Sequence, residues 1–406
     1  MKFQIIDGGV TSPEGFVSSG ISCGLKGENL KDLALIKSTK LCNSAGVYTK
    51  NKVKGAPLLV TKKHLKNKSA QAIIANSGNA NTCTGEEGIK NAEQMCEYAA
   101  KELGIESDNV LVASTGIIGF KLNIGAIKNA VPELVKRLDK QGYNDASKAI
   151  MTTDTVQKTM ALKLEISGKT ATIGIMAKGS GMIHPNMGTM LSFITTDINI
   201  SSELLEKALK ESVRISYNRV SVDGDTSTND MVLILANGLA GNPVIEEEND
   251  DYKVFLEALK KLNIKIAKMI AKDGEGATKL IECRVLNVPD EKEAEILGKS
   301  VICSSLVKTA FFGCNANWGR ILDAVGYSGV DFDINKLQVS MESSKGNVLV
   351  FKDGEPVSFS NDKATDILSE DEVSIILNFN SGSCSVCCWG CDLTYDYIKI
   401  NGSYMS

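Results

Sequence analysis

The chain of 406 residues contains only two histidines, His64 and His184. A Ser-His-Asp hydrolase or a metalloenzyme with histidine ligands would have to be built around one of these two side chains. The chain also lacks a basic tract, and its net charge is −4 with a pI of about 5.6. Nucleic acids and anionic membrane surfaces are therefore poor candidates for its partners.

Long apolar runs are missing as well. The apolar stretch at residues 3–6 is too short for a signal peptide, and no segment approaches the roughly 20 apolar residues of a membrane span. The hydrophobic content of 43% and the charged content of 23% are ordinary for a soluble globular protein. We therefore expect a cytoplasmic protein, with two or three packed units because of its length.

Eleven cysteines are present, but their placement does not resemble the disulfide framework of a small secreted protein. Four of them, Cys384, Cys387, Cys388 and Cys391, form two overlapping C-x-x-C pairs that raise the alternative of a zinc or iron–sulfur site. The surrounding pattern is that of a strand, in which the adjacent Cys387 and Cys388 point to opposite faces. Small buried thiols are the favoured interpretation, and no metal is expected.

A glycine-rich loop joins two short apolar runs, residues 171–177 and 190–196, which we predict to be strands. A loop of this kind is usually part of the surface. This one carries apolar side chains and ends at the Gly188–Thr189 bond, directly before the second strand. Because Gly188 has no side chain, its carbonyl can be approached closely. Attack by the Thr189 hydroxyl would cut the chain and free an α-amine that can serve as its own base.

Several blocks of the chain carry a resemblance to one family. They are residues 178–191, residues 76–81 (Asn-Ser-Gly-Asn-Ala-Asn), residues 110–119, residues 222–230 (Val-Asp-Gly-Asp-Thr-Ser-Thr-Asn-Asp) and residues 317–322 (Asn-Trp-Gly-Arg-Ile-Leu). These blocks resemble those of ornithine acetyltransferases, the glutamate N-acetyltransferases of arginine biosynthesis, and the likeness covers nearly the whole chain. The resemblance implies a self-processing α/β protein with an αββα-like sandwich body and a smaller C-terminal α/β domain.

The resemblance also implies the roles of individual residues. The matched positions are Thr189 as nucleophile, Gly188 before the cut, Thr115 and Gly116 as oxyanion hole, and Thr152, Lys178, Thr189, Glu275, Asn401 and Ser406 as substrate contacts. Thr152 is chosen over its neighbour Thr153. The chain departs from the family pattern at Gly188, where alanine is usual, at Asn315, where aspartate is usual, and at Ser406, which replaces a threonine.

The implied reaction passes acetyl from N2-acetylornithine to glutamate through an acetyl-threonine, without a metal or organic cofactor. No residue decides whether acetyl-CoA also serves as donor. Cleavage would give residues 1–188 and 189–406, the latter containing the C-terminal domain at about 283–406, in a heterotetramer with two copies of each. The alternatives are a self-cleaving aminopeptidase or amidohydrolase of related architecture, and a binding protein that lacks catalysis.

Three further expectations concern local structure. The apolar run at residues 58–60 is assigned to a strand, and residues 290–313 to one helix and its end. The polar stretch 218–230 has the wrong spacing for a calcium loop, and we expect it to be structural around the active site.

Overall fold

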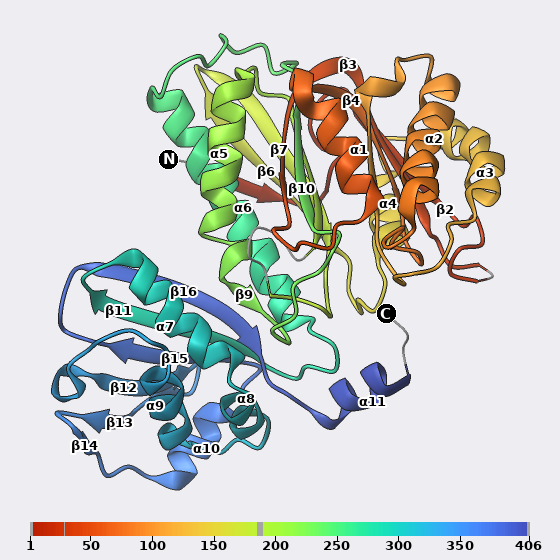
Figure 1. The fold of residues 1–406 in the computed structure, drawn as a ribbon. Helices are drawn as coiled ribbons and strands as arrows, with labels where there is room; N and C mark the ends of the chain where they lie inside the picture. The colour runs from red at the N-terminus through yellow and green to blue at the C-terminus, as the bar shows by residue number, and fades with distance from the viewer. Residues whose placement is uncertain (1–2, 28, 185–189, 404–406) are drawn as a thin grey trace.

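The computed structural model describes residues 3–27, 29–184 and 190–403, and over these ranges it contains a nine-stranded and a seven-stranded β-sheet (Figure 1). The larger sheet has the strand order β1-β6-β7-β8-β10-β3-β4-β5, with β2 beside β3. Its strands are β1 (Gln4–Ile6), β2 (Phe16–Ile21), β3 (Leu33–Tyr48), β4 (Ser69–Asn76), β5 (Val110–Ser114), β6 (Lys158–Ile166), β7 (Lys169–Lys178), β8 (Leu191–Thr196) and β10 (Met231–Ala236). The expected strands on either side of the glycine-rich loop are confirmed as β7 and β8.

Strand β3 bends the larger sheet into two layers. Its residues 33–38 pair with β2, and residues 33–37 also pair with β4, whereas its residues 43–48 pair with β10. Side chains alternate along it, so that Leu35 joins an outer core and Ile36 joins the core between the layers. One long strand therefore belongs to both halves of a folded sheet.

Helices cover both outer faces of the folded sheet, and one of them packs into the core between its layers. They are α1 (Ala56–His64), α2 (Gly85–Leu103), α3 (Ile124–Lys136), α4 (Tyr143–Ile150), α5 (Ser202–Arg214) and α6 (Asp250–Lys272). Leu205 of α5 and Leu262 of α6 share one outer core with Ile173 and Ile194, and Met95 of α2 and Val131 of α3 belong to the other. Helix α4 contributes to the inner core. The expected αββα-like layering is confirmed.

The smaller sheet has the order β14-β13-β12-β15-β11-β16-β9, and all of its strands except β9 lie from Leu280 onward. Its strands are β9 (Val220–Ser221), β11 (Leu280–Val288), β12 (Gln338–Ser343), β13 (Gly346–Lys352), β14 (Glu355–Pro356), β15 (Glu372–Asn378) and β16 (Cys384–Cys391). Its helices are α7 (Glu291–Cys303), α8 (Ser305–Phe312), α9 (Trp318–Gly326) and α10 (Asn361–Leu368). The last helix, α11 (Tyr395–Ser403), leaves this unit toward the larger one (Figure 1).

Two local expectations are wrong. Residues 58–60 lie in helix α1, with Pro57 in its first turn, and a three-residue apolar run is too short to reveal which period it follows. The predicted single helix after Asp290 is two helices, α7 and α8. They meet at Ser304, whose extended backbone ends the first helix and whose hydroxyl accepts a hydrogen bond from the Val307 N–H of the second.

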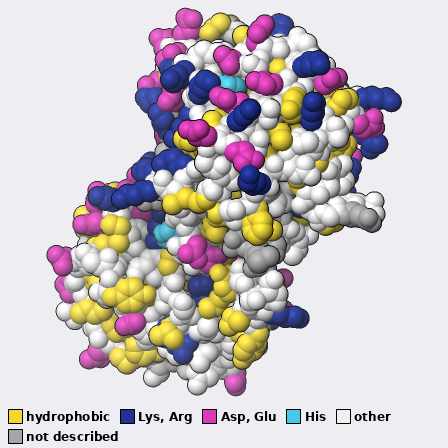
Figure 2. All heavy atoms as spheres, turned by 45° about the vertical axis from the view of Figure 1, so that its right-hand side comes forward, with side chains coloured by type: hydrophobic (Ala, Val, Ile, Leu, Met, Phe, Trp, Pro, Cys, Tyr) yellow, Lys and Arg dark blue, Asp and Glu magenta, His cyan; other side chains and the backbone are white. Residues whose placement is uncertain are grey.

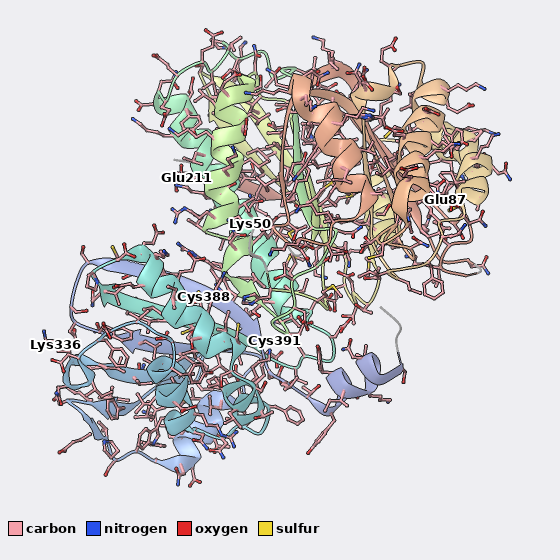
Figure 3. All side chains as sticks on the ribbon, in the orientation of Figure 1. Lys50, Glu87, Glu211, Lys336, Cys388 and Cys391 are labelled. Atoms are coloured by element: carbon pink, nitrogen blue, oxygen red, sulfur yellow. The ribbon has the colours of Figure 1, made fainter. Side chains whose placement is uncertain are left out.

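The cysteines of β16 are divided by burial. Cys388 and Cys391, labelled in Figure 3, are buried, whereas Cys384 and Cys387 are half-buried. Burial raises the pKa of Cys388 to about 12, which makes it an unreactive thiol. Across the part of the chain that the structure describes, no cluster of three or more His, Cys, Asp or Glu side chains could hold a metal ion.

Basic and acidic side chains are interspersed over the face of the molecule drawn in Figure 2. Among the described residues, no helix has both the length and the apolar character that crossing a membrane requires.

Candidate active site

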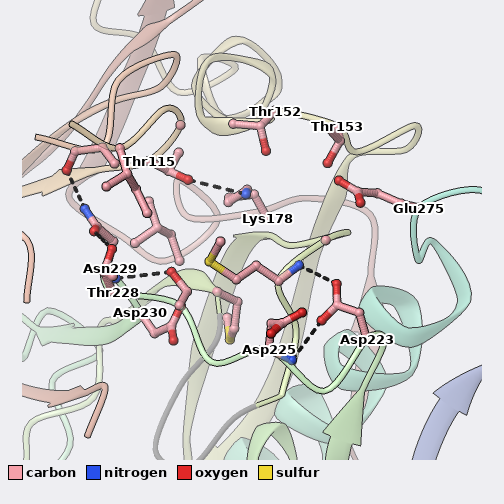
Figure 4. A pocket seen from close by; sticks show the side chains of 18 of the residues that line it. Thr115, Thr152, Thr153, Lys178, Asp223, Asp225, Thr228, Asn229, Asp230 and Glu275 are labelled. Carbon is pink, nitrogen blue, oxygen red and sulfur yellow. Dashed lines mark hydrogen bonds between the residues drawn. The ribbon is translucent and has the colours of Figure 1, made fainter. Parts of the chain in front are cut away.

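A pocket of about 160 Å³ lies at the ends of the central strands of the larger sheet, and residues of α11 line part of it (Figure 4). Its volume is smaller than that of pockets for drug-sized ligands, so it suits a small molecule. Loops far apart in sequence contribute to its wall. They supply Thr115 and Gly116 after β5, Thr152 and Thr153 after α4, Lys178 at the end of β7, Met190 before β8, Asp223 to Asp230 before β10, Glu275 after α6, and Tyr397 and Asn401 from α11.

Lys178 provides the positive end of the pocket. It is 7% exposed, and its Nζ lies 3.4 Å from the hydroxyl of Thr115. Burial lowers the pKa of Lys178, and the nearby carboxylate of Asp154 opposes that shift. A buried cation of this kind favours an anionic ligand group, because such a group would restore part of the interaction energy lost with water.

A buried ionic cluster lies behind Lys178. The ammonium of Lys158 is 2.7 Å from Asp154 Oδ1 and 2.5 Å from Asp273 Oδ2, and the Lys158 side chain is fully buried. Burial by itself would raise the pKa of Asp154, but Lys178 and Lys158 outweigh it and lower the pKa to about 2. Asp154 is therefore held as a carboxylate between two lysines.

This cluster ties together the loops that form the pocket. Asp154 accepts hydrogen bonds from the N–H of Thr152 at 3.1 Å and from the N–H of Gly179, the neighbour of Lys178, at 2.7 Å. The backbone carbonyl of Asp273 accepts a hydrogen bond from the Ser180 hydroxyl at 2.7 Å. One set of buried charges thus fixes the backbone on both sides of the predicted substrate contacts.

Glu275 provides the negative end of the pocket. Its N–H donates to the Ser180 carbonyl at 3.1 Å, and its Oε2 accepts a hydrogen bond from Asn401 Nδ2 at 2.7 Å. A Cβ atom at Gly181 would lie 2.2 Å from Glu275 Oε1, so a side chain at that position would displace the Glu275 carboxylate. The pocket therefore offers a carboxylate and an ammonium to one small ligand.

The predicted oxyanion hole is a tight crossing of two loops. Gly116 has φ +127°, and a Cβ there would lie 2.4 Å from the backbone carbonyl carbon of Gly78. The N–H of Thr115 already donates to the Asn76 carbonyl at 3.0 Å. The donor that Thr115 can offer to a ligand is therefore its hydroxyl, because its backbone N–H is already engaged.

Six of the predicted site residues line this one pocket. They are Thr115, Gly116, Thr152, Lys178, Glu275 and Asn401. Thr153 lines it too, so the choice between the two threonines stays a prediction. Gly188, Thr189 and Ser406 lie outside the described residues.

The sequence reasoning missed several acidic residues of the site. Asp154 and Asp273 were not singled out, and the aspartates of 218–230 were assigned a structural role only. Asp223 does act structurally, because its carboxylate accepts the N–H groups of Met182 at 2.6 Å and Ile183 at 2.9 Å. Asp230 lies in the pocket wall. The high density of polar residues in the stretch 218–230 could have indicated that these residues belong to the site.

The folded α/β body thus holds a small pocket with opposite charges, which suits a small ligand that carries both charges, as an amino acid does. The sequence profile of the ArgJ family matches residues 17–406. The arginine biosynthesis bifunctional protein ArgJ 1 of Clostridium acetobutylicum is 51% identical over 397 residues, which cover 98% of this chain and 97% of that protein. The ArgJ protein of Caldanaerobacter subterraneus is 48% identical over 99% of both chains. This chain belongs to the ArgJ family, so the expected family of arginine-biosynthesis acyltransferases is confirmed.

Solved structures give matches to parts of the chain. The bifunctional ArgJ protein of Bacillus halodurans is 42% identical, with a TM-score of 0.44, and covers 46% of this chain and 98% of its own. The ornithine acetyltransferase of Mycobacterium tuberculosis, solved in complex with ornithine, is 35% identical with a TM-score of 0.43, covering 46% of this chain and all of its own.

Proposed function

We propose that this enzyme transfers the acetyl group of N2-acetylornithine to glutamate through an acetyl ester on Thr189. The observation that carries the proposal is the pairing of Lys178 and Glu275 across one small pocket. Acetylornithine and glutamate both carry an α-carboxylate, which the ammonium of Lys178 would bind. The side-chain ammonium of ornithine would bind the carboxylate of Glu275. Membership of the ArgJ family supports the same pair of substrates.

The reaction would proceed by double displacement. The Thr189 hydroxyl attacks the acetyl carbonyl, while its proton passes to the free α-amine of the same residue. The Thr115 hydroxyl and the Gly116 N–H stabilise the negative oxygen that forms. Ornithine leaves with the proton, and the amine of glutamate then attacks the ester to give N-acetylglutamate and regenerate Thr189.

The nucleophile requires cleavage after Gly188, which would divide the chain into residues 1–188 and 189–406. The strand order supports an assembly that survives this cut. Strands β8 and β10 come from the second piece, and they lie between β7 and β3 of the first. We further propose two copies of each piece in a cytoplasmic heterotetramer, with the smaller unit at about 283–406 belonging to the second piece.

Intact mass under denaturing conditions tests the proposal on freshly purified protein. We expect two fragments that meet at Gly188–Thr189 and whose masses sum to the 43.5 kDa chain plus one water. Incubation with N2-acetylornithine should then add one acetyl group to the fragment that begins at Thr189. A folded but uncut chain would contradict the proposal. Release of acetyl to water in place of transfer to glutamate would favour the related hydrolases.

Replacing Glu275 with Gln should raise the KM for N2-acetylornithine by about tenfold to a hundredfold, because a hydrogen bond between two charged groups is lost. The KM for glutamate should change less, since glutamate lacks the side-chain ammonium. Steady-state kinetics with each substrate varied in turn measures both constants. Glu106→Gln is the control, because Glu106 is exposed and outside the pocket. Equal changes for both substrates would argue against the assigned contact.

A further inference from the structure

The charged side chains of the pocket wall are mostly acidic. Among the described residues that line it, the basic one is Lys178, and the acidic ones are Asp223, Asp225, Asp230 and Glu275 (Figure 4). Residues 185–189 and 404–406, which lie outside the described ranges, contain no lysine, arginine or histidine. The side chains of the wall therefore offer a ligand one cation, that of Lys178.

The two proposed substrates place different demands on this wall. The carboxylate and the side-chain ammonium of ornithine match Lys178 and Glu275. Glutamate instead carries two carboxylates, both ionised at neutral pH. Under the proposed mechanism the α-amine of Thr189 acts as a base, so it is neutral and does not serve as a second cation. One carboxylate of glutamate is thus left to meet an acidic wall, where like charges repel.

Glu275 has one carboxyl oxygen that is available to a ligand. The residue is 8% exposed and lines the pocket. Its Oε2 accepts the hydrogen bond from Asn401 Nδ2 at 2.7 Å. Its Oε1 lies against Gly181, and within the described part of the chain no hydrogen-bond donor reaches it. A ligand group beside Oε1 therefore meets an oxygen without a donor.

The other titratable groups around Glu275 do not supply the missing positive charge. Both oxygens of Asp223 accept backbone N–H groups, and Asp225 is exposed to solvent. Burial raises the pKa of Asp230 well above its usual value. Burial also raises the pKa of Tyr397, so its hydroxyl stays neutral. Asp273, two residues before Glu275, is paired with the buried Lys158.

We propose that glutamate binds together with one proton, which is shared between its side-chain carboxyl group and Glu275 Oε1. This inference rests on the proposed function. Two carboxyl groups that share a site hold a proton more tightly than either does alone, because the proton removes the repulsion between two negative charges. The proton is taken up from water on binding and is returned when the product leaves. Ornithine binds the same oxygen as a carboxylate, without a proton.

Lys26 is an alternative partner for the second carboxylate of glutamate. It is close enough to Lys178 for their charges to interact, but it is not among the residues that line the pocket. Its Nζ donates a hydrogen bond to the carbonyl of Met151 at 2.8 Å. Binding a ligand would require Lys26 to break that hydrogen bond, so the structure favours the shared proton.

Calorimetric titration of the wild-type enzyme with glutamate, in the absence of an acetyl donor, tests the proposal. Repeating the titration in two buffers with different enthalpies of ionisation counts the protons that are taken up on binding. We expect about one proton for glutamate and close to none for ornithine, which has the same α-amino acid group. The Kd for glutamate should then rise roughly tenfold per pH unit above neutrality, relative to that for ornithine.

Glu275→Gln should bind glutamate without taking up a proton, because its amide can donate the hydrogen bond that the shared proton supplies. Asp225→Asn is the matched control, since Asp225 is another acid of the wall, and it should take up about one proton as the wild type does. Thermal melts establish that both variants are folded.

Binding of glutamate to the wild type without proton uptake would overturn the inference, and weaker glutamate binding by Lys26→Met would then assign the contact to Lys26. Unchanged uptake in a folded Glu275→Gln would overturn it as well. An enzyme that binds neither amino acid would instead contradict the proposed function, so the two failures can be told apart.

Discussion

Replacing Lys158 with Met should lower the free energy of unfolding by about 3–5 kcal/mol, the usual cost of removing one partner from a buried ion pair. Methionine has a similar length, so little packing is lost. What remains is Asp154 and Asp273, two buried carboxylates that have lost the ammonium between them. Urea unfolding of the variant and the wild type under identical conditions measures the difference.

Lys163→Met is the control for this experiment, because Lys163 lies on the same strand, β6, and is exposed. Its unfolding free energy should change by no more than about 0.5 kcal/mol. A similar small effect for Lys158→Met would show that the buried cluster contributes little. Since Asp154 holds the backbone of Thr152 and Gly179, the variant should also bind its substrates more weakly.

The same cluster gives the protein an acid-sensitive component of stability. The folded-state pKa of Asp154 is about 2, below its usual value of 3.8. Ionised Asp154 therefore contributes stability in full above the usual value, and this contribution is lost as the pH falls toward about 2. In Lys158→Met this component should be smaller, since one of the two lysines that depress the pKa is gone.

Thr189→Ala should abolish both cleavage and acetyl transfer. Alanine has no hydroxyl, so neither the ester that precedes the cut nor the acetyl-enzyme can form. Intact mass should give one species of 43.5 kDa, less the mass difference between the two side chains, and no acetyl adduct. The expected loss of activity is complete because the proposed transfer passes only through the ester on Thr189.

Thr189→Ser is the matched control for that loss. Serine retains the hydroxyl, so the chain should still be cut and should still form an acetyl ester, with a rate changed only by the missing methyl group. An active Thr189→Ala, or a Thr189→Ser that is folded but uncut, would argue against a hydroxyl nucleophile at this position.

Much of the fold could be predicted from the sequence where a pattern was long enough to show its period. The apolar side of α6 recurs over 23 residues, and the strands around the glycine-rich loop are continuous apolar runs. The run at residues 58–60 was assigned wrongly because three residues fit a strand and a helix equally well. The N-cap residue Ser304 was also not recognised as a boundary between two helices, because it lies inside a continuous helical pattern.

The candidate site was less accessible to such reasoning. No period in the sequence indicates that Lys158 meets Asp273, because that contact depends on how β6 and the end of α6 pack together. Lys178 and Glu275 were named through family resemblance, and the structure adds that they line the same pocket. Residue types also do not predict that Oδ2 of Asp230 is buried and has no hydrogen-bond donor among the described residues, since both facts follow from packing.

The position of β8 and β10 between strands of the other piece has a thermodynamic consequence. In an uncut chain, folding is unimolecular and its equilibrium does not depend on how much protein is present. Under the proposed cleavage, unfolding would release two separate molecules, and their entropy of mixing would favour the unfolded state upon dilution. Self-processing would thus turn one folding reaction into an association reaction, with a melting temperature that rises with protein concentration.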